Sequence, residues 1–341
     1  MRKKYFIQQY TQQEYLHGGV GATDAEKILS SLEFTPVSFP HHFSFSLKAK
    51  FSRLFRLMRM IFSVKRKSII LFLFPVYARM DRLLLRFLRM KGVKLICIIA
   101  DIEGIRDADQ ELLKTETRQL KRCRHFIVHT NKMRLLVEQL VPGSICSILY
   151  FFDFLAPQVN SQRLKSNDIV FAGNLGKSRF LLSLNHTSFS NLHFNLYGPG
   201  VSQKILAFKN ISYYGVSKPY DMPSIVQGSF GLIWDGESID NCSGIYGEYV
   251  RYNSQHKLSL YILSGLPVVI WEEAATAELV KEYNIGFTVK SLHEIGSKIK
   301  ALTGDDYLQM QTNMRPLAEK ISKGEFLSKA VDEMMKRIET V

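Results

Sequence analysis

The chain has 341 residues, 46% of them hydrophobic and 22% charged, so it has the length of two ordinary domains and can bury a core in each. This composition excludes an intrinsically disordered chain. The formal net charge of +14 indicates an anionic partner. The alternatives are nucleic acid, an anionic membrane surface and a phosphorylated substrate.

The cysteines and the apolar segments bear on whether the protein binds zinc, forms disulfides or crosses a membrane. Cys97, Cys123, Cys146 and Cys242 are scattered without a Cys-x-x-Cys pair, which argues against both a zinc site and a disulfide framework. The basic start of the chain lacks the apolar core of a signal peptide, and no stretch approaches the roughly 18 apolar residues of a spanning helix. We therefore expect a cytoplasmic protein that is soluble or peripheral at the inner face of the membrane.

The chain opens with a strand, a glycine loop and a helix. Residues 5–8 predict the strand, His17–Gly21 the loop and 23–32 the helix. This order is typical of a nucleotide-binding αβ unit, although the spacing is not Gly-x-Gly-x-x-Gly. The glycines indicate either close backbone approach by a ligand or a tight turn.

The most basic segment, 48–67, predicts an amphipathic helix. Basic residues recur every third position at Lys50, Arg53, Arg56 and Arg59, and helical apolar spacing is followed by Phe51, Leu54, Phe55, Met58, Ile61 and Phe62. The pattern favours contact with an anionic membrane surface. The alternative is an ordinary domain helix with a solvated basic face. Nucleic acid is disfavoured because no zinc-finger spacing, RNA-recognition motif or helix-turn-helix accompanies the charge.

Two unbroken apolar runs, 68–74 and 93–100, predict strands of a parallel sheet that is buried on both faces. Asp101 and Glu103 come directly after the second run, at the edge where open α/β sheets bind ligands. A carboxylate in this position is a candidate general base. The alternative role for both residues is to cap the helix that follows.

Two more strands, 126–129 and 147–152, complete the first half of the chain. His129, at the end of the first of these, either reaches a ligand or is a structural polar neighbour. The polar segment 161–166 predicts a linker. We therefore place the first domain at 1–162.

The second half restarts the alternation of strands and helices. Strands are predicted at 169–172, 192–197, 211–214, 230–234, 268–271 and 286–289. The glycine turn after the first carries Lys177 and Arg179, which suits a phosphate. The second domain is placed at 163–320, and a helical segment at 321–341 is expected to pack back on the first domain. Two successive αβ halves predict an α/β protein with two Rossmann-like parallel-sheet domains that face each other across a cleft.

The stretch 228–271 organises the second domain. A strand and a long polar loop lead into a helix predicted at 255–264. Asn253 or Ser254 is the expected N-cap, and Gly265 lies where a C-terminal glycine belongs.

The charge at the start of this helix points to a ligand. His256 and Lys257 lie in the first turn, where the helix dipole disfavours a cation by roughly 0.3–1 kcal/mol. Free amides at a helix N-terminus together with a lysine form an anion site, which a diphosphate would suit. The alternative is a solvated lysine on an exposed turn.

Lys257, followed by the Gly-x-Pro-Val turn Gly265–Val268, resembles the donor domain of GT-B glycosyltransferases. A narrower resemblance lies in 171–178, 231–236, 243–249 and, in the first half, 101–106. These segments are similar to those of bacterial β-1,6-galactofuranosyltransferases of polysaccharide and O-antigen assembly. They are also similar to the related glucosyltransferases that extend the first GlcNAc on serine-rich streptococcal adhesins. The resemblance covers essentially the whole chain and is strongest from about 168 to 290.

The resemblance implies a UDP-sugar donor and a set of site residues. It places Arg179 and Tyr213 at the nucleotide, a residue of the loop with Gly18, Gly19 and Gly21 near the other side of the diphosphate, and around the diphosphate the turn Gln255, His256, Lys257, Leu258, Ser259 and Leu260. Asn174 and Lys177, in the glycine turn that suits a phosphate, complete the expected UDP site. Asp235, Tyr246 and Glu248 are candidates for holding the donor sugar. Lys257, Arg179 and His256 would stabilise the leaving diphosphate, and Asp101 or Glu103 would take the proton from the acceptor hydroxyl.

Two departures from related patterns bear on the mechanism. The Glu-x7-Glu pattern of retaining GT-B enzymes is absent, because Leu260 stands five positions before Gly265, and this favours inversion of the anomeric centre. Asp107-Ala108-Asp109 matches the metal motif Asp-x-Asp, but it does not directly follow a strand. We expect it to open a helix, and we expect no metal.

The leading expectation is transfer of galactofuranose from UDP-galactofuranose to a lipid-linked glycan in bacterial cell-surface polysaccharide synthesis. The chain would meet the membrane through 48–67, would bind no nucleic acid and, like related enzymes, would form homo-oligomers. One alternative is a transferase that uses UDP-glucose or another UDP-hexose on a glycoprotein. The other is a non-catalytic UDP-sugar-binding subunit.

Overall fold

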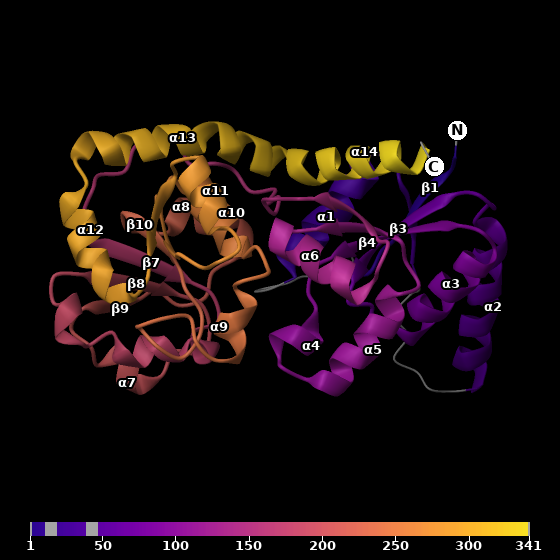
Figure 1. Ribbon diagram of the computed structural model, residues 1–341, viewed down its shortest axis with the longest axis horizontal. Helices are drawn as coiled ribbons and strands as arrows, with labels where there is room; N and C mark the ends of the chain where they lie inside the picture. The colour runs from indigo at the N-terminus through magenta and orange to yellow at the C-terminus, as the bar shows by residue number, and fades with distance from the viewer. Residues whose placement is uncertain (1, 11–18, 39–46, 340–341) are drawn as a thin grey trace.

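The computed structural model describes residues 2–10, 19–38 and 47–339. The chain forms two lobes, each built around a six-stranded sheet in which all the strands are parallel (Figure 1). The strand orders are β2-β1-β3-β4-β5-β6 and β12-β11-β10-β7-β8-β9. The prediction of an α/β protein with two parallel sheets is confirmed.

The first lobe contains the strands β1 (Lys4–Ile7), β2 (Thr35–Val37), β3 (Ile69–Phe74), β4 (Lys94–Ile99), β5 (His125–Val128) and β6 (Ile145–Ile148). Its helices are α1 (Val20–Ser31), α2 (Leu47–Ser63), α3 (Arg79–Met90), α4 (Glu103–Arg106), α5 (Gln110–Leu120) and α6 (Asn131–Leu140). The second lobe contains β7 (Asp168–Ala172), β8 (His193–Tyr197), β9 (Ile211–Tyr213), β10 (Phe230–Ile233), β11 (Val268–Trp271) and β12 (Gly286–Val289). Its helices are α7 (Gln203–Leu206), α8 (Met222–Ile225), α9 (Ile245–Tyr249), α10 (His256–Leu263), α11 (Ala277–Glu282), α12 (Ile295–Ala301) and α13 (Gly304–Lys323), and α14 (Glu325–Glu339) ends the chain.

The central strands of the first lobe are apolar along their whole length because helices cover both faces of the sheet. All six residues of β3 are buried. Ile70 and Phe72 face the core shared with α2, α3, α5 and α6, whereas Leu71 and Leu73 face the core shared with α1 and α14. Strands buried on both sides need no polar alternation, which is why β3 and β4 could be recognised as continuous apolar runs.

The last two helices join the lobes. α13 packs on α10 of the second lobe, and α14 then packs on β5 and β6 of the first, so the pair runs along one side of the whole molecule (Figure 1). Asp153 holds the start of α14, since its carboxylate accepts hydrogen bonds from the backbone N–H groups of Phe326 and Leu327 at 3.2 and 2.7 Å. Burial raises the pKa of Asp153 to about 7.

Buried polar contacts also hold the lobes together. The carboxylate of Asp24 on α1 accepts a hydrogen bond from the Tyr220 hydroxyl at 2.6 Å and another from the backbone N–H of Leu155 at 2.9 Å. The Thr130 hydroxyl, at the start of α6, donates to the carbonyl of Tyr252 at 2.6 Å. The two sheets are therefore fixed relative to each other by side chains from both halves of the chain.

Several predicted boundaries are wrong. α1 begins at Val20 with Gly19 in a left-handed conformation as its N-cap, so Gly21 lies inside the helix rather than in a loop. β6 ends at Ile148 and not at 152, and the basic helix ends at Ser63 and not at 67. No helix in the described part of the chain has the length and apolar character that a membrane span requires.

Candidate active site

The start of α10 lies at the carboxyl edge of the second sheet and lacks the cap that we predicted. Neither Asn253 nor Ser254 is the N-cap; Gln255 takes that position, and no side chain accepts a hydrogen bond from the first amides. The opposite end follows the prediction, since Gly265 adopts the left-handed φ of 64° just beyond the helix. The helix is therefore terminated by its glycine, while its positive end is left without a side-chain acceptor.

The residues that lead into α10 carry buried polar atoms without partners. Within the described residues, no hydrogen bond is made by Oδ1 of Asn253, Oγ of Ser254, both amide atoms of Gln255 or Nε2 of His256. Ser254 and Gln255 are 3% and 8% exposed, so water does not freely solvate them. Buried polar groups in folded proteins are normally satisfied, and a run of four residues with orphaned atoms points to a polar ligand.

Lys257 extends from the first turn of α10 into the same region. Its Nζ lies 4.3 Å from the centroid of the Phe171 ring and 3.6 Å from Oδ2 of Asp235. A Cβ at Gly173 would meet Lys257 Cε at 3.0 Å, so the lysine packs directly on the glycine turn that follows β7. The structure thus brings Lys257 and Asp235 together with this turn, from three segments of the second lobe.

His256 brings the first lobe to this helix start. A Cβ at Gly21 would lie 3.2 Å from Cδ2 of His256, and the ring packs on Phe154 with centroids 4.7 Å apart. Burial lowers the pKa of His256, which favours the uncharged imidazole. Its Nε2 has no hydrogen-bond partner among the described residues and can serve a ligand. Gly19 caps α1 nearby in sequence, and Gly18 lies outside the described residues.

The side chains in the rest of the predicted turn are buried within the protein. Leu258 and Leu260 are buried in the core of the second lobe. Ser259 is also buried, and its hydroxyl donates to the carbonyl of Phe152. These three residues can offer a ligand only their backbone N–H groups, and the N–H of Leu258 already donates to the Gln255 carbonyl at 3.0 Å.

The other predicted UDP residues lie around the turns after β7 and β8. Asn174 is the N-cap of a short 3-10 segment and is exposed, as is Lys177. Arg179 is 70% exposed and lies 3.5 Å from Glu237, a pairing too solvated to hold it firmly. Tyr213, on the edge strand β9, is 37% exposed and donates its hydroxyl to the Gly198 carbonyl at 3.0 Å.

The candidates for the donor sugar divide into two groups. Asp235 contacts Lys257 as described, and the Tyr246 ring lies 5.1 Å from Nζ of Lys177. Glu248, an exposed residue of α9, instead pairs with Arg251 at 2.8 Å. Glu248 is therefore not brought into contact with the Lys257 cluster.

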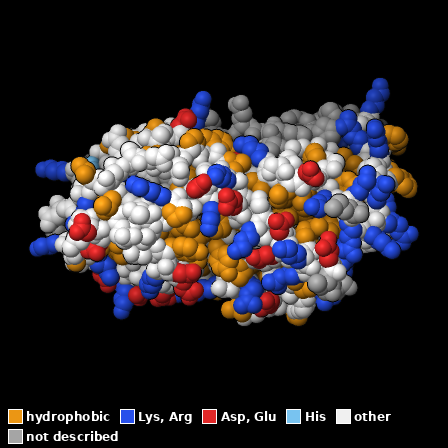
Figure 2. Space-filling model, turned by 90° about the horizontal axis from the view of Figure 1, so that it is seen from above, with side chains coloured by type: hydrophobic (Ala, Val, Ile, Leu, Met, Phe, Trp, Pro, Cys, Tyr) orange, Lys and Arg blue, Asp and Glu red, His pale blue; other side chains and the backbone are white. Residues whose placement is uncertain are grey.

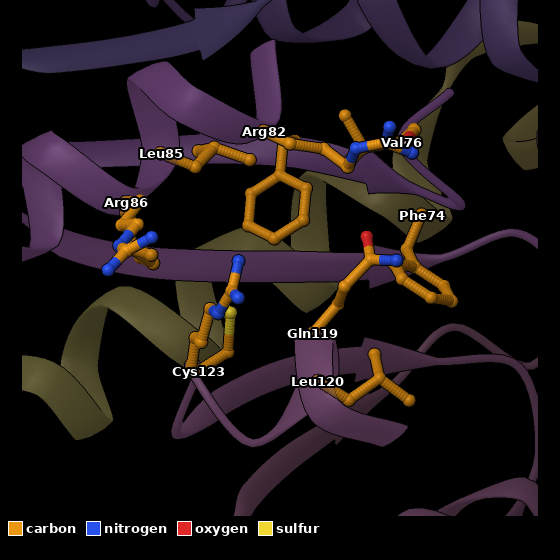
Figure 3. Close-up of a pocket in the computed structure, with 11 residues that line it drawn as sticks. Phe74, Val76, Arg82, Leu85, Arg86, Gln119, Leu120 and Cys123 are labelled. Carbon is orange, nitrogen blue, oxygen red and sulfur yellow. Dashed lines mark hydrogen bonds between the residues drawn. The ribbon is translucent and has the colours of Figure 1, made fainter. Parts of the chain in front are cut away.

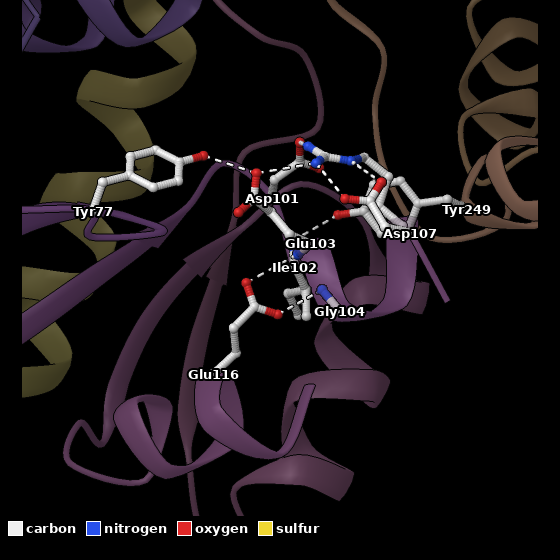
Figure 4. Close-up of polar contacts among 9 residues, drawn as sticks. Tyr77, Asp101, Ile102, Glu103, Gly104, Asp107, Glu116 and Tyr249 are labelled. Atoms are coloured by element: carbon white, nitrogen blue, oxygen red, sulfur yellow. Dashed lines mark hydrogen bonds and ion pairs between the residues drawn. The ribbon is translucent and has the colours of Figure 1, made fainter. Parts of the chain in front are cut away.

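In the first lobe, Asp101 and Glu103 share one guanidinium (Figure 4). Arg106 donates to Asp101 Oδ2 at 2.5 Å and to Glu103 Oε1 at 3.0 Å, and it also binds Asp107. Glu103 accepts a further hydrogen bond from the Tyr77 hydroxyl at 2.9 Å. Burial raises the pKa of Asp101, and the opposing effect of Arg106 does not cancel this rise.

Tyr249 is the site residue that the sequence reasoning missed. It is buried on α9 of the second lobe, yet its hydroxyl accepts a hydrogen bond from the Ile102 backbone N–H at 2.9 Å and is hydrogen-bonded to Asp101 (Figure 4). It therefore links α9, which also carries Tyr246, to the carboxylates of the first lobe. Its place in the segment 243–249 was a signal, but nothing in the sequence shows that a second-lobe tyrosine reaches Asp101.

The alternative capping role for Asp101 and Glu103 is wrong. Glu116, a buried residue of α5, accepts hydrogen bonds from the first amides of α4, the N–H groups of Glu103 and Gly104, at 3.0 and 2.8 Å. Asp109 caps α5, so the Asp-x-Asp segment does open a helix. Within residues 2–10, 19–38 and 47–339, no group of three His, Cys, Asp or Glu side chains is placed to hold a metal ion.

His129, which the sequence left open, is buried at the end of β5 against the ring of Phe152, with centroids 4.4 Å apart. Burial lowers its pKa to about 4, so it is neutral at pH 7. Both of its ring nitrogens are buried without a hydrogen-bond partner among the described residues, a property that it shares with the residues leading into α10.

Both halves of the chain match models of one protein family. Residues 3–140 match the family model of the glucosyltransferase 3-like N-terminal domain, and residues 169–334 match that of the C-terminal domain. The chain is 27% identical over 290 residues to the β-1,6-galactofuranosyltransferase WbbI of Escherichia coli, covering 84% of each chain. It is 26% identical over 324 residues to glucosyltransferase 3 of Streptococcus gordonii, covering 93% of each.

Among solved structures, the Anabaena protein HepE, crystallised with UDP-glucose, superposes over 100% of both chains with a TM-score of 0.64 at 11% identity. At this identity the likeness concerns the fold, in which two parallel-sheet lobes form the GT-B arrangement. Because both domain models match in order and together span most of the sequence, the chain belongs to the glucosyltransferase 3-like family and is a glycosyltransferase of the GT-B fold.

Proposed function

We propose that the chain transfers a sugar from a UDP-sugar, with the diphosphate bound at the start of α10. The observation that carries this proposal is the uncapped helix start, where Asn253, Ser254, Gln255 and His256 hold partnerless buried polar atoms beside the Lys257 ammonium. A diphosphate would accept from the free amides and side-chain donors and would offset both the helix dipole and the lysine. The UDP-glucose complex of the structurally similar HepE supports the same donor class.

The uridine would extend from the diphosphate toward β9. Tyr213 presents a ring that is 37% exposed beside the Gly198 turn, and an exposed aromatic ring can stack on a base. Arg179 and Lys177 lie on the neighbouring turn, are exposed, and can swing toward phosphate or ribose oxygens.

The reaction breaks the bond between the sugar's anomeric carbon and the diphosphate oxygen. Negative charge develops on the leaving diphosphate, and Lys257 with the α10 amides would stabilise it without reorganising. These groups can do this without a metal ion, which we therefore do not invoke. The acceptor oxygen would attack the anomeric carbon from the opposite side, with inversion, and would lose its proton to a carboxylate.

We assign the role of base to Asp101 rather than to Glu103. Asp101 directly follows β4, is hydrogen-bonded to Tyr249 of the second lobe, and has a pKa raised by burial, which makes its carboxylate a better proton acceptor. Glu103 is held by both Arg106 and Tyr77 and would orient the guanidinium.

The donor we propose is UDP-galactofuranose, and the acceptor a lipid-linked glycan of a bacterial surface polysaccharide. The 27% identity to the galactofuranosyltransferase WbbI supports this choice. The second candidate is UDP-glucose with a glycoprotein acceptor, which the 26% identity to glucosyltransferase 3 favours.

The test is UDP release from the purified enzyme with a panel of UDP-sugars and a lipid-linked glycan acceptor. Turnover with UDP-galactofuranose alone supports the first candidate, and turnover with UDP-glucose on a glycosylated protein supports the second. Tight UDP binding without turnover, unaffected by Asp101→Asn, would show a non-catalytic subunit and overturn the proposal.

A further inference from the structure

The outer face of α2 exposes a continuous apolar stripe. Five side chains spaced as one helical face are 44–73% exposed, namely Phe51, Leu54, Phe55, Met58 and Phe62. The helix buries a different side against the lobe, with Leu57 in the core. Most of the apolar side chains that predicted an amphipathic helix are thus exposed, whereas an ordinary domain helix buries its apolar stripe.

Neighbouring α3 extends this surface and holds α2 in place. Phe87 and Met90 on α3 are 40% and 75% exposed. The Lys91 ammonium, just after α3, donates to the carbonyls of Phe62 and Val64 at the end of α2. These bonds satisfy carbonyls that the helix end leaves free, so the stripe belongs to a packed part of the lobe.

Positive charge surrounds the stripe. Residues 47–91 contain thirteen Lys or Arg and a single acidic residue, Asp81, a net +12 of the chain's +14. Asp81 is buried and does not reach the surface. Arg59, Arg86 and Arg89 are exposed and form no ion pair with any acidic residue that the structure describes. Figure 2 shows Lys and Arg gathered at the end of the molecule that carries α2 and α3.

A crevice between α3 and α5 opens beside this surface (Figure 3). Its walls are apolar, formed by Phe72, Phe74, Val76, Leu85, Leu95 and Leu120, and its volume of about 30 Å³ has room for about one water molecule. Arg82, Arg86 and Arg122 line it as well. The crevice is too small for an acyl chain, but three guanidinium groups beside an exposed apolar surface suit lipid phosphates, which accept bidentate hydrogen bonds from arginine.

We propose that the α2–α3 face, defined by the stripe, Phe87, Met90 and the surrounding basic residues, docks on an anionic lipid bilayer. The phenylalanines would enter the interface between headgroups and acyl chains, and the arginines would bind lipid phosphates. A second copy of the chain is the poorer occupant, because two faces of net +12 repel each other. Nucleic acid would leave the apolar stripe unburied.

This inference deepens the proposed function by placing a lipid-linked acceptor beside the lobe that carries Asp101. Its test does not depend on that function, because vesicle binding is measured without donor or acceptor. The assay is vesicle flotation, with phosphatidylcholine vesicles compared with vesicles that contain phosphatidylglycerol in addition. The UDP-release assay with a detergent-free, short-chain acceptor runs in parallel.

Two variants test the two parts of the surface. Arg59→Glu with Arg89→Glu should weaken binding to anionic vesicles roughly 25-fold or more, since each basic residue near such a surface contributes about fivefold. Phe51→Ser with Phe55→Ser should weaken it at least about tenfold through lost apolar burial. Both should keep wild-type UDP release with the short acceptor.

Matched controls lie on the second lobe. Lys298→Glu with Lys300→Glu reverses the same number of exposed charges on α12, and Leu164→Ser removes an exposed leucine; both should bind vesicles as the wild type does. The inference fails if the wild type binds neither vesicle, binds both equally, or loses binding equally in the controls. It also fails if the stripe variants instead dissolve a dimer of the wild type.

Discussion

Replacing Lys257 with alanine should remove most of the catalytic rate while leaving the fold intact. The ammonium is held between the face of Phe171 and the carboxylate of Asp235, at 4.3 and 3.6 Å, and its side chain is 17% exposed. A unit charge about 4 Å from a phosphate contributes about 4 kcal/mol at an effective dielectric constant near 20. In other enzymes, removing one hydrogen-bond donor from a developing oxyanion costs about 2.7–4 kcal/mol, so we expect kcat to fall about 10²- to 10³-fold.

The cost in stability should be small by comparison. The variant loses one cation–π contact and one partly solvated ion pair, together worth about 1–2 kcal/mol. The assay pairs UDP release and UDP binding by calorimetry with thermal unfolding. Lys281→Ala, on the exposed side of α11, is the matched control and should leave all three unchanged.

One outcome would refute the reasoning about Lys257. A variant with wild-type kcat and an unchanged Kd for UDP would show that the ammonium does not contact the diphosphate. A variant that loses activity only because it unfolds would leave catalysis unexplained, so Lys257→Arg is included. It keeps the charge but must fit a larger head against Gly173, and it should recover part of the rate.

Three further predictions follow from the contacts. Asp101→Asn should lower kcat about 10²- to 10⁴-fold and abolish the rise of rate with pH, whereas Glu103→Gln should keep that pH profile; the reverse result would exchange their roles. Gly198→Ala would place a Cβ 1.9 Å from the Gly173 carbonyl oxygen and should lower both Tm and UDP affinity. The control is Gly296→Ala on α12, where a Cβ meets no atom within 4 Å, and it should raise stability by about 0.5–1 kcal/mol. The pKa of Asp153 is raised to about 7 in the folded protein, so between the unfolded and folded pKa values folding binds a proton. The contribution of this group to the free energy of unfolding should therefore fall by about 4 kcal/mol as pH rises from about 4 to 8. Urea titrations over this range should show a flatter pH dependence for Asp153→Asn than for the wild type, and identical slopes would contradict the prediction.

The sequence by itself determined the architecture of this protein. Unbroken apolar runs such as 68–74 identify strands covered on both faces, and their alternation with helical segments allows little other than parallel sheets. The glycine after α10 and the lysine in its first turn were also readable locally, because capping and the helix dipole act within a few residues.

Only the tertiary structure decided which polar residues meet. Tyr249 reaches Asp101 from the other lobe, and Glu116 satisfies the start of α4 from α5, so contacts far apart in sequence settle the roles of the carboxylates. The same holds for burial: the pKa of His256 is lowered because residues of both lobes enclose its ring. The face of α2 that the core leaves exposed is likewise set by how the helix docks on α3, since helical spacing shows that a stripe exists but not which side the protein covers.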